Sequence, residues 1–181
     1  MSDLLAKELV IHAAPSLLGI KPANLINLDY KEEIKEDLCH LISNVNKKIC
    51  FRILKIKNGK ALVLIYHKNL LNKCLNEKMT KEFLNDMNYV NCNNINEYLD
   101  ILSRRINNNL EFPHEIGVFL GYDLYDIKHF IKNDLPCIYT GYWKVYSKLD
   151  EKLETFKKYD YVSNYMKNLF DKGYNIEKLL N

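Results

Sequence analysis

The stretch ICFRILKIKNGKALVLIY, residues 49–66, decides the fold class. Ile49–Lys57 and Lys60–Tyr66 are rich in β-branched and aromatic residues, which favour strands. Between them, Asn58 and Gly59 both tolerate the positive φ angles of a type I′ turn, which joins antiparallel strands. The stretch therefore predicts a β-hairpin, and the rest of the chain is expected to pack against it.

Upstream of the hairpin, the sequence predicts two helices and a connection between them. Asp3–Ala13 is expected to be helical and to be stopped by Pro15. Apolar residues recur at helical spacing over Asp29–Asn46, with the aspartate as the amino-terminal cap. Glycine and proline favour an irregular, apolar, packed connection over residues 16–25.

Downstream of the hairpin, helical patterns alternate with short strand patterns. Helices are expected at Leu70–Asn76, Thr80–Met87 with Thr80 as its cap, Ile95–Ile106, Pro113–Leu120, Leu124–Asn133 capped by Asp123, Leu149–Phe170 and Ile176–Leu180, and strands at Tyr89–Cys92, Cys137–Tyr139 and Tyr142–Tyr146. The sequence therefore predicts an α+β fold: a small, mainly antiparallel sheet, with a hairpin at about 49–66, packed against several helices. No repeat or linker divides residues 1–181, so a single domain is expected.

Composition excludes several classes of protein. The chain has 181 residues with 48% hydrophobic and 27% charged residues, the balance of a globular domain. Its net charge of +3 arises from 26 basic and 23 acidic residues, which does not favour a nucleic-acid partner. No apolar run reaches the roughly 18 residues of a membrane helix, and charged residues interrupt any signal-peptide core near the amino terminus. No membrane association is expected.

The cysteines and histidines give no sign of a metal centre. Five cysteines are scattered without a C-x-x-C pair, which is typical of reduced thiols in the cytoplasm: Cys39, Cys50, Cys74, Cys92 and Cys137. No histidine pair has metal-ligand spacing, and no glycine-rich phosphate loop occurs. We therefore expect a cytoplasmic protein with no metal, and the sequence identifies no cofactor.

Two compact boxes carry most of the chemistry: FPHEIGVFLGY at Phe112–Tyr122 and GYWKVY at Gly141–Tyr146. Together with HAAP at His12–Pro15 and GIKPANL at Gly19–Leu25, they resemble an uncharacterised family of small proteins from clostridia and related Firmicutes. The resemblance implies no activity, only motif positions: His12, Pro15, Lys21, Arg105, Phe112, Pro113, His114, Glu115, Gly117, Gly121, Tyr122, Gly141, Trp143, Lys144 and Tyr146. Family members often carry cysteines where this chain has Ala13 and Thr140, so the resemblance does not extend to a thiolate metal or redox site.

His114 and Glu115 have two interpretations. In the first turn of a helix that begins at Pro113, the carboxylate could satisfy free amides and the imidazole a carbonyl, which is a purely structural role. Alternatively, a neutral His114 acts as general acid/base or ligand donor, with Glu115 nearby. Neighbouring residues lie about 100° apart around a helix, so a direct His–Glu dyad is not expected.

The remaining candidates also have a structural and a functional interpretation. Arg105 borders an apolar stripe and is expected to reach either a buried carboxylate or an anionic ligand, whereas Arg104 is the simple partner of Asp100. Strand alternation places Lys144 between Tyr142 and Tyr146 on the face opposite Trp143, as an anion site or a solvated face. His12 and Lys21 flank the apolar connection, which either lines a cleft or only packs.

Three functions remain open from the sequence. The first is a cytoplasmic binding protein for a small anionic or nucleotide-like ligand, with His12, Lys21, Arg105, Tyr122, Trp143, Lys144 and Tyr146 as binding residues. The second is a hydrolase or transferase in which His114 is general acid/base, helped by Glu115. The third is a protein-interaction or regulatory module, in anaerobic iron or redox metabolism, that docks through its tryptophan face.

Overall fold

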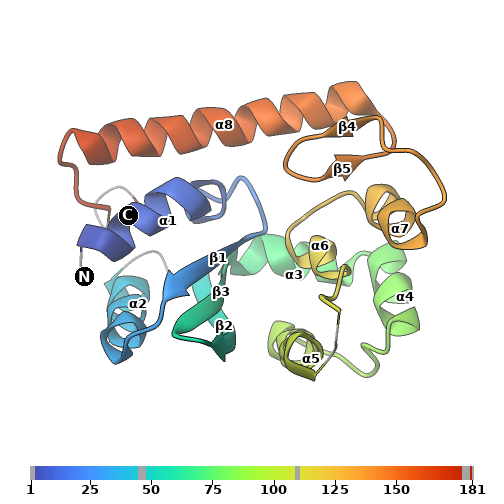
Figure 1. Ribbon diagram of the computed structural model, residues 1–181, viewed down its shortest axis with the longest axis horizontal. Coiled ribbons are helices and arrows are strands. Elements are labelled where there is room, and N and C mark those ends of the chain that lie inside the picture. The colour runs from blue at the N-terminus through green and yellow to red at the C-terminus, as the bar shows by residue number, and fades with distance from the viewer. Residues whose placement is uncertain (1–2, 45–47, 109–110, 177–179, 181) are drawn as a thin grey trace.

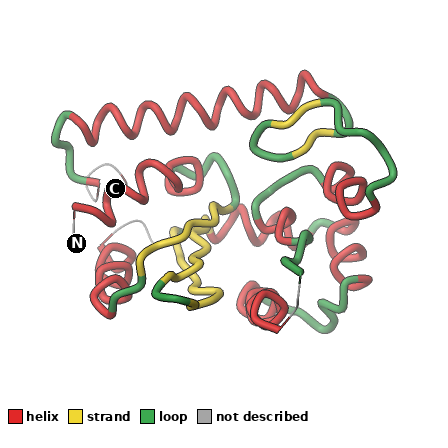
Figure 2. Tube along the Cα trace, in the orientation of Figure 1, coloured by secondary structure: helices red, strands yellow, loops and turns green. Residues whose placement is uncertain are grey.

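The computed structural model describes residues 3–44, 48–108, 111–176 and 180 of the chain, and it confirms the α+β class. Figures 1 and 2 show the helices around a small central sheet. In chain order the elements are α1 (Asp3–Leu17), β1 (Ala23–Asp29), α2 (Glu32–Asn44), β2 (Ile49–Lys57), β3 (Lys60–His67), α3 (Lys68–Asn76), α4 (Lys78–Asp86), α5 (Ile95–Asn108), α6 (Ile116–Phe119), α7 (Leu124–Lys132), β4 (Tyr139–Thr140), β5 (Lys144–Val145) and α8 (Leu149–Asp171).

The predicted hairpin is confirmed as β2 and β3. Asn58 and Gly59 have φ angles of 51° and 69°, the positive values that a type I′ turn requires. β3 is the central strand of an antiparallel sheet with the order β1-β3-β2, and β1 pairs with it from Ala23 opposite Tyr66 to Asp29 opposite Lys60. A separate two-stranded ribbon is formed by β4 and β5.

Apolar residues on β3 alternate between the two faces of the sheet, and both faces are covered by helices. Val63 and Ile65 belong to a buried cluster with α1 and the carboxyl-terminal half of α8. Leu64 and Tyr66 belong to a second cluster with α3, α5, α6 and α7. Because successive side chains of a strand point to opposite faces, one strand supplies both clusters.

The long helix α8 crosses from one cluster to the ribbon (Figure 1). Its 23 residues span about 34 Å at the usual helical rise. Met166 is buried in the cluster around α1, whereas Phe156 packs on the rings of Tyr142 and Trp143 in the ribbon. The helix therefore places β4 and β5 relative to the sheet.

Upstream, the structure differs from prediction at the connection between the first two helices. α1 continues through Pro15, and it ends at Leu17 where Gly19 adopts a φ of 67°. The expected irregular connection over 16–25 is wrong in its second half, because β1 starts at Ala23 and finds a partner in β3. Asp29 ends this strand and pairs with Lys60, so it does not cap α2.

Further differences occur beyond the hairpin. The expected strand Tyr89–Cys92 is a turn region, in which Asn88 and Asn91 adopt positive φ angles. The expected helix Pro113–Leu120 shrinks to Ile116–Phe119, and α4 begins before Thr80, with Glu77 in the cap position. The end of the expected second helix, at 45–46, and part of the expected last turn, at 177–179, lie outside the described residues. Every helix in the described part of the chain is too short or too polar to span a membrane.

Candidate functional site

Two glycines shape the Phe112–Tyr122 box. A Cβ at Gly117 would lie 3.0 Å from the Ile127 side chain, so the absence of a side chain lets α6 pack closely on α7. Gly121 has a φ of 73°, and a Cβ there would lie 2.6 Å from Pro22. The box therefore folds as a turn followed by a single helical turn, held against α7 and the start of β1.

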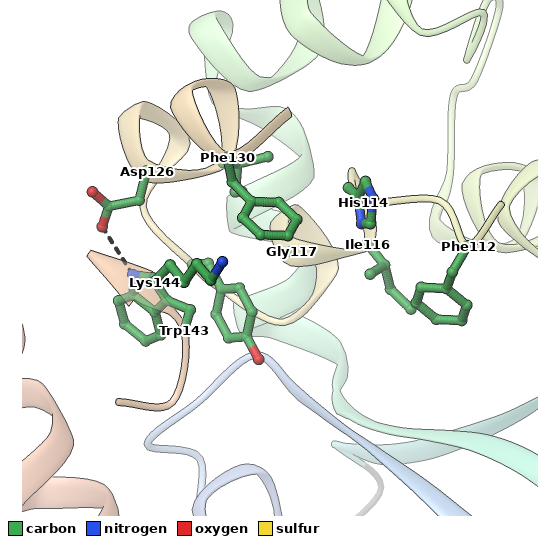
Figure 3. Close-up of a pocket in the computed structure, with 10 residues that line it drawn as sticks. Phe112, His114, Ile116, Gly117, Asp126, Phe130, Trp143 and Lys144 are labelled. Atoms are coloured by element: carbon green, nitrogen blue, oxygen red, sulfur yellow. Dashed lines mark hydrogen bonds between the residues drawn. The ribbon is translucent and has the colours of Figure 1, made fainter. Parts of the chain in front are cut away.

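This box, α7 and the ribbon enclose a cavity of about 210 Å³. Its walls are mainly aromatic and aliphatic, and Figure 3 shows that they come from both sides of the opening. The lining residues are Phe112, His114, Ile116, Gly117, Tyr122, Asp126, Ile127, Phe130, Trp143 and Lys144.

Two basic side chains lie at the cavity, one from each wall (Figure 3). The ring of His114 meets the ring of Phe130 edge to face, with the centroids 4.9 Å apart. The ammonium of Lys144 lies 5.4 Å from the centroid of the same Phe130 ring. Both His114 and Lys144 are exposed, whereas Ile116 and Gly117 deeper in the cavity are buried. The cavity is therefore apolar inside and basic at its mouth.

Asp126 fixes the indole wall of the cavity. Only 1% exposed, its carboxylate accepts hydrogen bonds from Trp143 Nε1 and from the Tyr146 backbone nitrogen, both at 2.8 Å. The ammonium of Lys152 lies 4.0 Å from Asp126 and 2.6 Å from Asp123. Because these groups compensate its charge, Asp126 anchors the ribbon to α7 and α8 and holds Trp143 in place.

The Trp143 ring also contacts an aromatic residue of the Phe112–Tyr122 box. Tyr122 stacks on Trp143, with centroids 4.7 Å apart and an interplanar angle of 23°. Burial raises the pKa of Tyr122, so its hydroxyl stays neutral at physiological pH. Tyr122 also lines a wider hollow of about 520 Å³ beside α3 and α4.

Glu115 points away from the cavity into a buried polar cluster. Its carboxylate, 3% exposed, pairs with the Arg105 guanidinium and accepts a hydrogen bond of 3.0 Å from the Tyr89 hydroxyl. Arg105 also donates to the backbone carbonyl of Met87 at 3.2 Å. Burial, together with the Glu115 charge, raises the pKa of Tyr89. The cluster holds the His114 segment against α5.

Lys21 lies in a cage of tyrosine rings. Its ammonium is 5.4 Å from the ring centroid of Tyr122, 5.9 Å from that of Tyr142 and 5.6 Å from that of Tyr159. The residue is 3% exposed, and burial lowers the pKa of Lys21 from 10.5 to about 8. The rings attract the cation through their π faces, which compensates part of the cost of burying it.

Comparison with known proteins reveals one family. Residues 9–180 match the model of a family described as protein of unknown function, DUF3793. The chain belongs to this family. The match confirms the resemblance to an uncharacterised family. No curated protein and no solved structure matches the chain.

The cavity of this DUF3793 chain brings together four of the predicted site residues: His114, Tyr122, Trp143 and Lys144. His12, Lys21, Arg105, Glu115 and Tyr146 do not line it. The reasons differ. His12 lies on the surface of α1, 3.5 Å from Glu8, and Arg105 and Glu115 neutralise each other. The tyrosine cage encloses Lys21, and Tyr146 contributes only its backbone nitrogen to Asp126.

Two details of the predicted contacts are wrong. Glu115 makes no side-chain bond to the amides of α6, because its carboxylate is engaged by Arg105 and Tyr89. The carboxylate of Asp100 on α5 pairs with Arg52 on β2. Arg104 donates a hydrogen bond only to the backbone oxygen of Asp100. Both errors arise because partners far apart in sequence displace the local ones.

Sequence reasoning missed Asp126 and Phe130 as parts of the site. Acidic residues are common near the start of a helix, so Asp126 does not stand out in the sequence. The signal that could have identified it was Trp143: a buried indole N–H needs an acceptor, and Asp126 lies on the neighbouring helix.

The cavity lining carries few reactive groups. It contains no serine, threonine or cysteine among the described residues. Groups of three or more potential metal ligands are absent from the part of the chain that the structure describes. The features present are aromatic surface and two basic groups.

Proposed function

We propose that the chain is a cytoplasmic binding protein for a small organic anion, and that the aromatic cavity is its binding site. The observation that carries this proposal is the polarity of the cavity: His114 and Lys144 lie at the mouth of a mainly apolar space, whose one carboxylate, Asp126, is engaged by Trp143 and the Tyr146 backbone. Pockets with mostly apolar walls and a few placed polar groups are typical ligand sites. The free state of all five cysteines agrees with a reducing compartment.

The alternatives have less support. A hydrolase or transferase needs a partner for His114, but the carboxylate of Glu115 is bound by Arg105. A docking surface needs an accessible tryptophan face, but Trp143 stacks on Tyr122 and packs edge to face on Phe156. Binding of a small anion needs only the exposed side chains of His114 and Lys144, without a further catalytic partner.

Thermal unfolding in the presence of benzoate, inorganic phosphate or AMP tests the proposal. At least one probe is expected to raise the melting temperature of the wild type, because binding to the folded state alone stabilises it. Phe130→Ala, which removes the ring that touches both basic groups, should lose the response. Tyr161→Ala, at an aromatic residue 72% exposed on α8, should keep it. An unresponsive wild type, or an equal response in Phe130→Ala, would contradict the proposal.

A further inference from the structure

We infer that the ligand of this cavity is a single-ring aromatic carboxylate, held with its ring inside the cavity and its carboxylate between His114 and Lys144. The inference rests on the proposed function and narrows it to one chemical class. Size, wall chemistry and charge each support it.

The size of the cavity corresponds to one ring. A cavity of about 150 Å³ engineered in another protein binds benzene, whereas typical pockets for drug-sized ligands have about 300–1,000 Å³. The cavity here, at about 210 Å³, therefore holds a ring with one small substituent. A nucleotide would leave its sugar and phosphate outside.

The walls offer aromatic surface in several orientations. Phe112, Phe130 and Trp143 all line the cavity, and Figure 3 shows Phe130 and Trp143 on one wall and Phe112 on the other. Aromatic pairs prefer edge-to-face or offset contacts, and these add about 0.5–1.5 kcal/mol beyond the area that they bury. A planar ring is therefore favoured over a saturated one of the same size.

The Lys144 ammonium and the His114 imidazole at the mouth favour a carboxylate, because one is a cation and both can donate hydrogen bonds. The His114 ring and the Lys144 ammonium both contact the ring of Phe130, so a planar anionic group beside that ring can approach both. The acidic group of the lining, Asp126, does not oppose an anion strongly, because it accepts two hydrogen bonds and lies 4.0 Å from the Lys152 ammonium. Arg105, the guanidinium best suited to a phosphate dianion, pairs with Glu115 and lies outside the cavity lining.

The chain carries its own reporter for this site. Trp143 is the single tryptophan of the sequence, and it lines the cavity. Titration of the full chain with benzoate, followed by tryptophan fluorescence, therefore measures binding at the cavity itself. Three further probes separate the contributions: benzamide lacks the charge, cyclohexanecarboxylate lacks the aromatic ring, and inorganic phosphate lacks both ring and carboxylate.

Benzoate is expected to give a saturable fluorescence change. Cyclohexanecarboxylate should bind about two- to tenfold more weakly through the loss of aromatic contacts, and benzamide about tenfold more weakly through the loss of charge. Lys144→Met should weaken benzoate binding about two- to fivefold, as expected for an exposed ion pair. Lys132→Met, at an exposed lysine of α7 outside the lining, should leave the affinity unchanged.

The possible failures are distinguishable. If inorganic phosphate binds as tightly as benzoate, or if AMP raises the melting temperature as much as benzoate does, the aromatic-carboxylate class is wrong although the chain still binds an anion. If benzamide equals benzoate, or if Lys144→Met binds like Lys132→Met, the assigned carboxylate site is wrong. If none of the probes changes either the fluorescence or the melting temperature, both the class and the proposed function are wrong.

Discussion

The pH dependence of stability should reveal the buried ammonium of Lys21. This cation lies among Tyr122, Tyr142 and Tyr159, and no described acidic side chain forms an ion pair or hydrogen bond with it. Replacement by methionine removes the charge but keeps an unbranched side chain of similar length. The variant Lys21→Met therefore isolates the cost of burying the charge.

The magnitude follows from the shift in pKa. Burial lowers the pKa of Lys21 from 10.5 in the exposed group to about 8, which corresponds to about 3 kcal/mol of unfavourable free energy in the charged form. This cost is fully present below about pH 8 and is relieved as pH rises toward 10.5, because the unfolded chain then binds more protons than the folded one.

Urea unfolding from about pH 7 to pH 9.5 measures the effect. At pH 7 we expect Lys21→Met to be about 3 kcal/mol more stable than the wild type. This advantage should shrink by about 2 kcal/mol between about pH 8 and pH 9.5. Lys128→Met, which removes a partly exposed lysine from the ring of Phe83, should keep the pH profile of the wild type. A difference between wild type and Lys21→Met that does not change with pH would refute the reasoning.

Three further substitutions near the site, and a comparison variant at Gly59, are tested by measuring the free energy of unfolding. Gly121→Ala should cost more than about 2 kcal/mol, because its Cβ would lie 2.6 Å from Pro22 at a φ of 73°. Gly59→Ala has a similar φ of 69° but open space around the Cβ, so it should cost about 1 kcal/mol. Equal losses in the two variants would contradict the close approach of Gly121 to Pro22. Asp126→Ala should cost about 3 kcal/mol, because it leaves the indole N–H of Trp143 and the backbone N–H of Tyr146 without their acceptor, and a loss below about 1 kcal/mol would contradict its role as anchor. Glu115→Gln should cost about 2–4 kcal/mol, because the paired Arg105 loses its counter-charge, and a neutral result would show that this carboxylate is dispensable.

Local signals in the sequence were sufficient for the elements that depend on local chemistry. Asn58 and Gly59 identify the hairpin because few residues tolerate their φ angles. The cap at Asp123 was also predictable, since its carboxylate accepts from the amides of Tyr125 and Asp126 next to it. In both cases the interacting atoms belong to the same few residues.

Non-local partners account for most of the errors. β1 was missed because its polar and apolar residues become a strand only when they pair with β3, about 40 residues away. For Arg105 a buried carboxylate was one of two expected partners, but nothing in the pattern identified Glu115 as that carboxylate. At the cavity, His114 and Lys144 both contact the ring of Phe130. Because the two residues lie 30 positions apart, the sequence pattern did not indicate that they share this partner.

The arrangement of the cavity along the chain has a consequence for how such proteins diverge. All of its lining residues fall between Phe112 and Lys144, whereas the three-stranded sheet is built from residues 23–67. Substitutions in the 112–144 segment can therefore change the cavity lining without altering the residues that build the sheet. Exchange of the 112–144 segment between homologues is expected to transfer the whole cavity lining as a unit, while the three-stranded sheet stays the same.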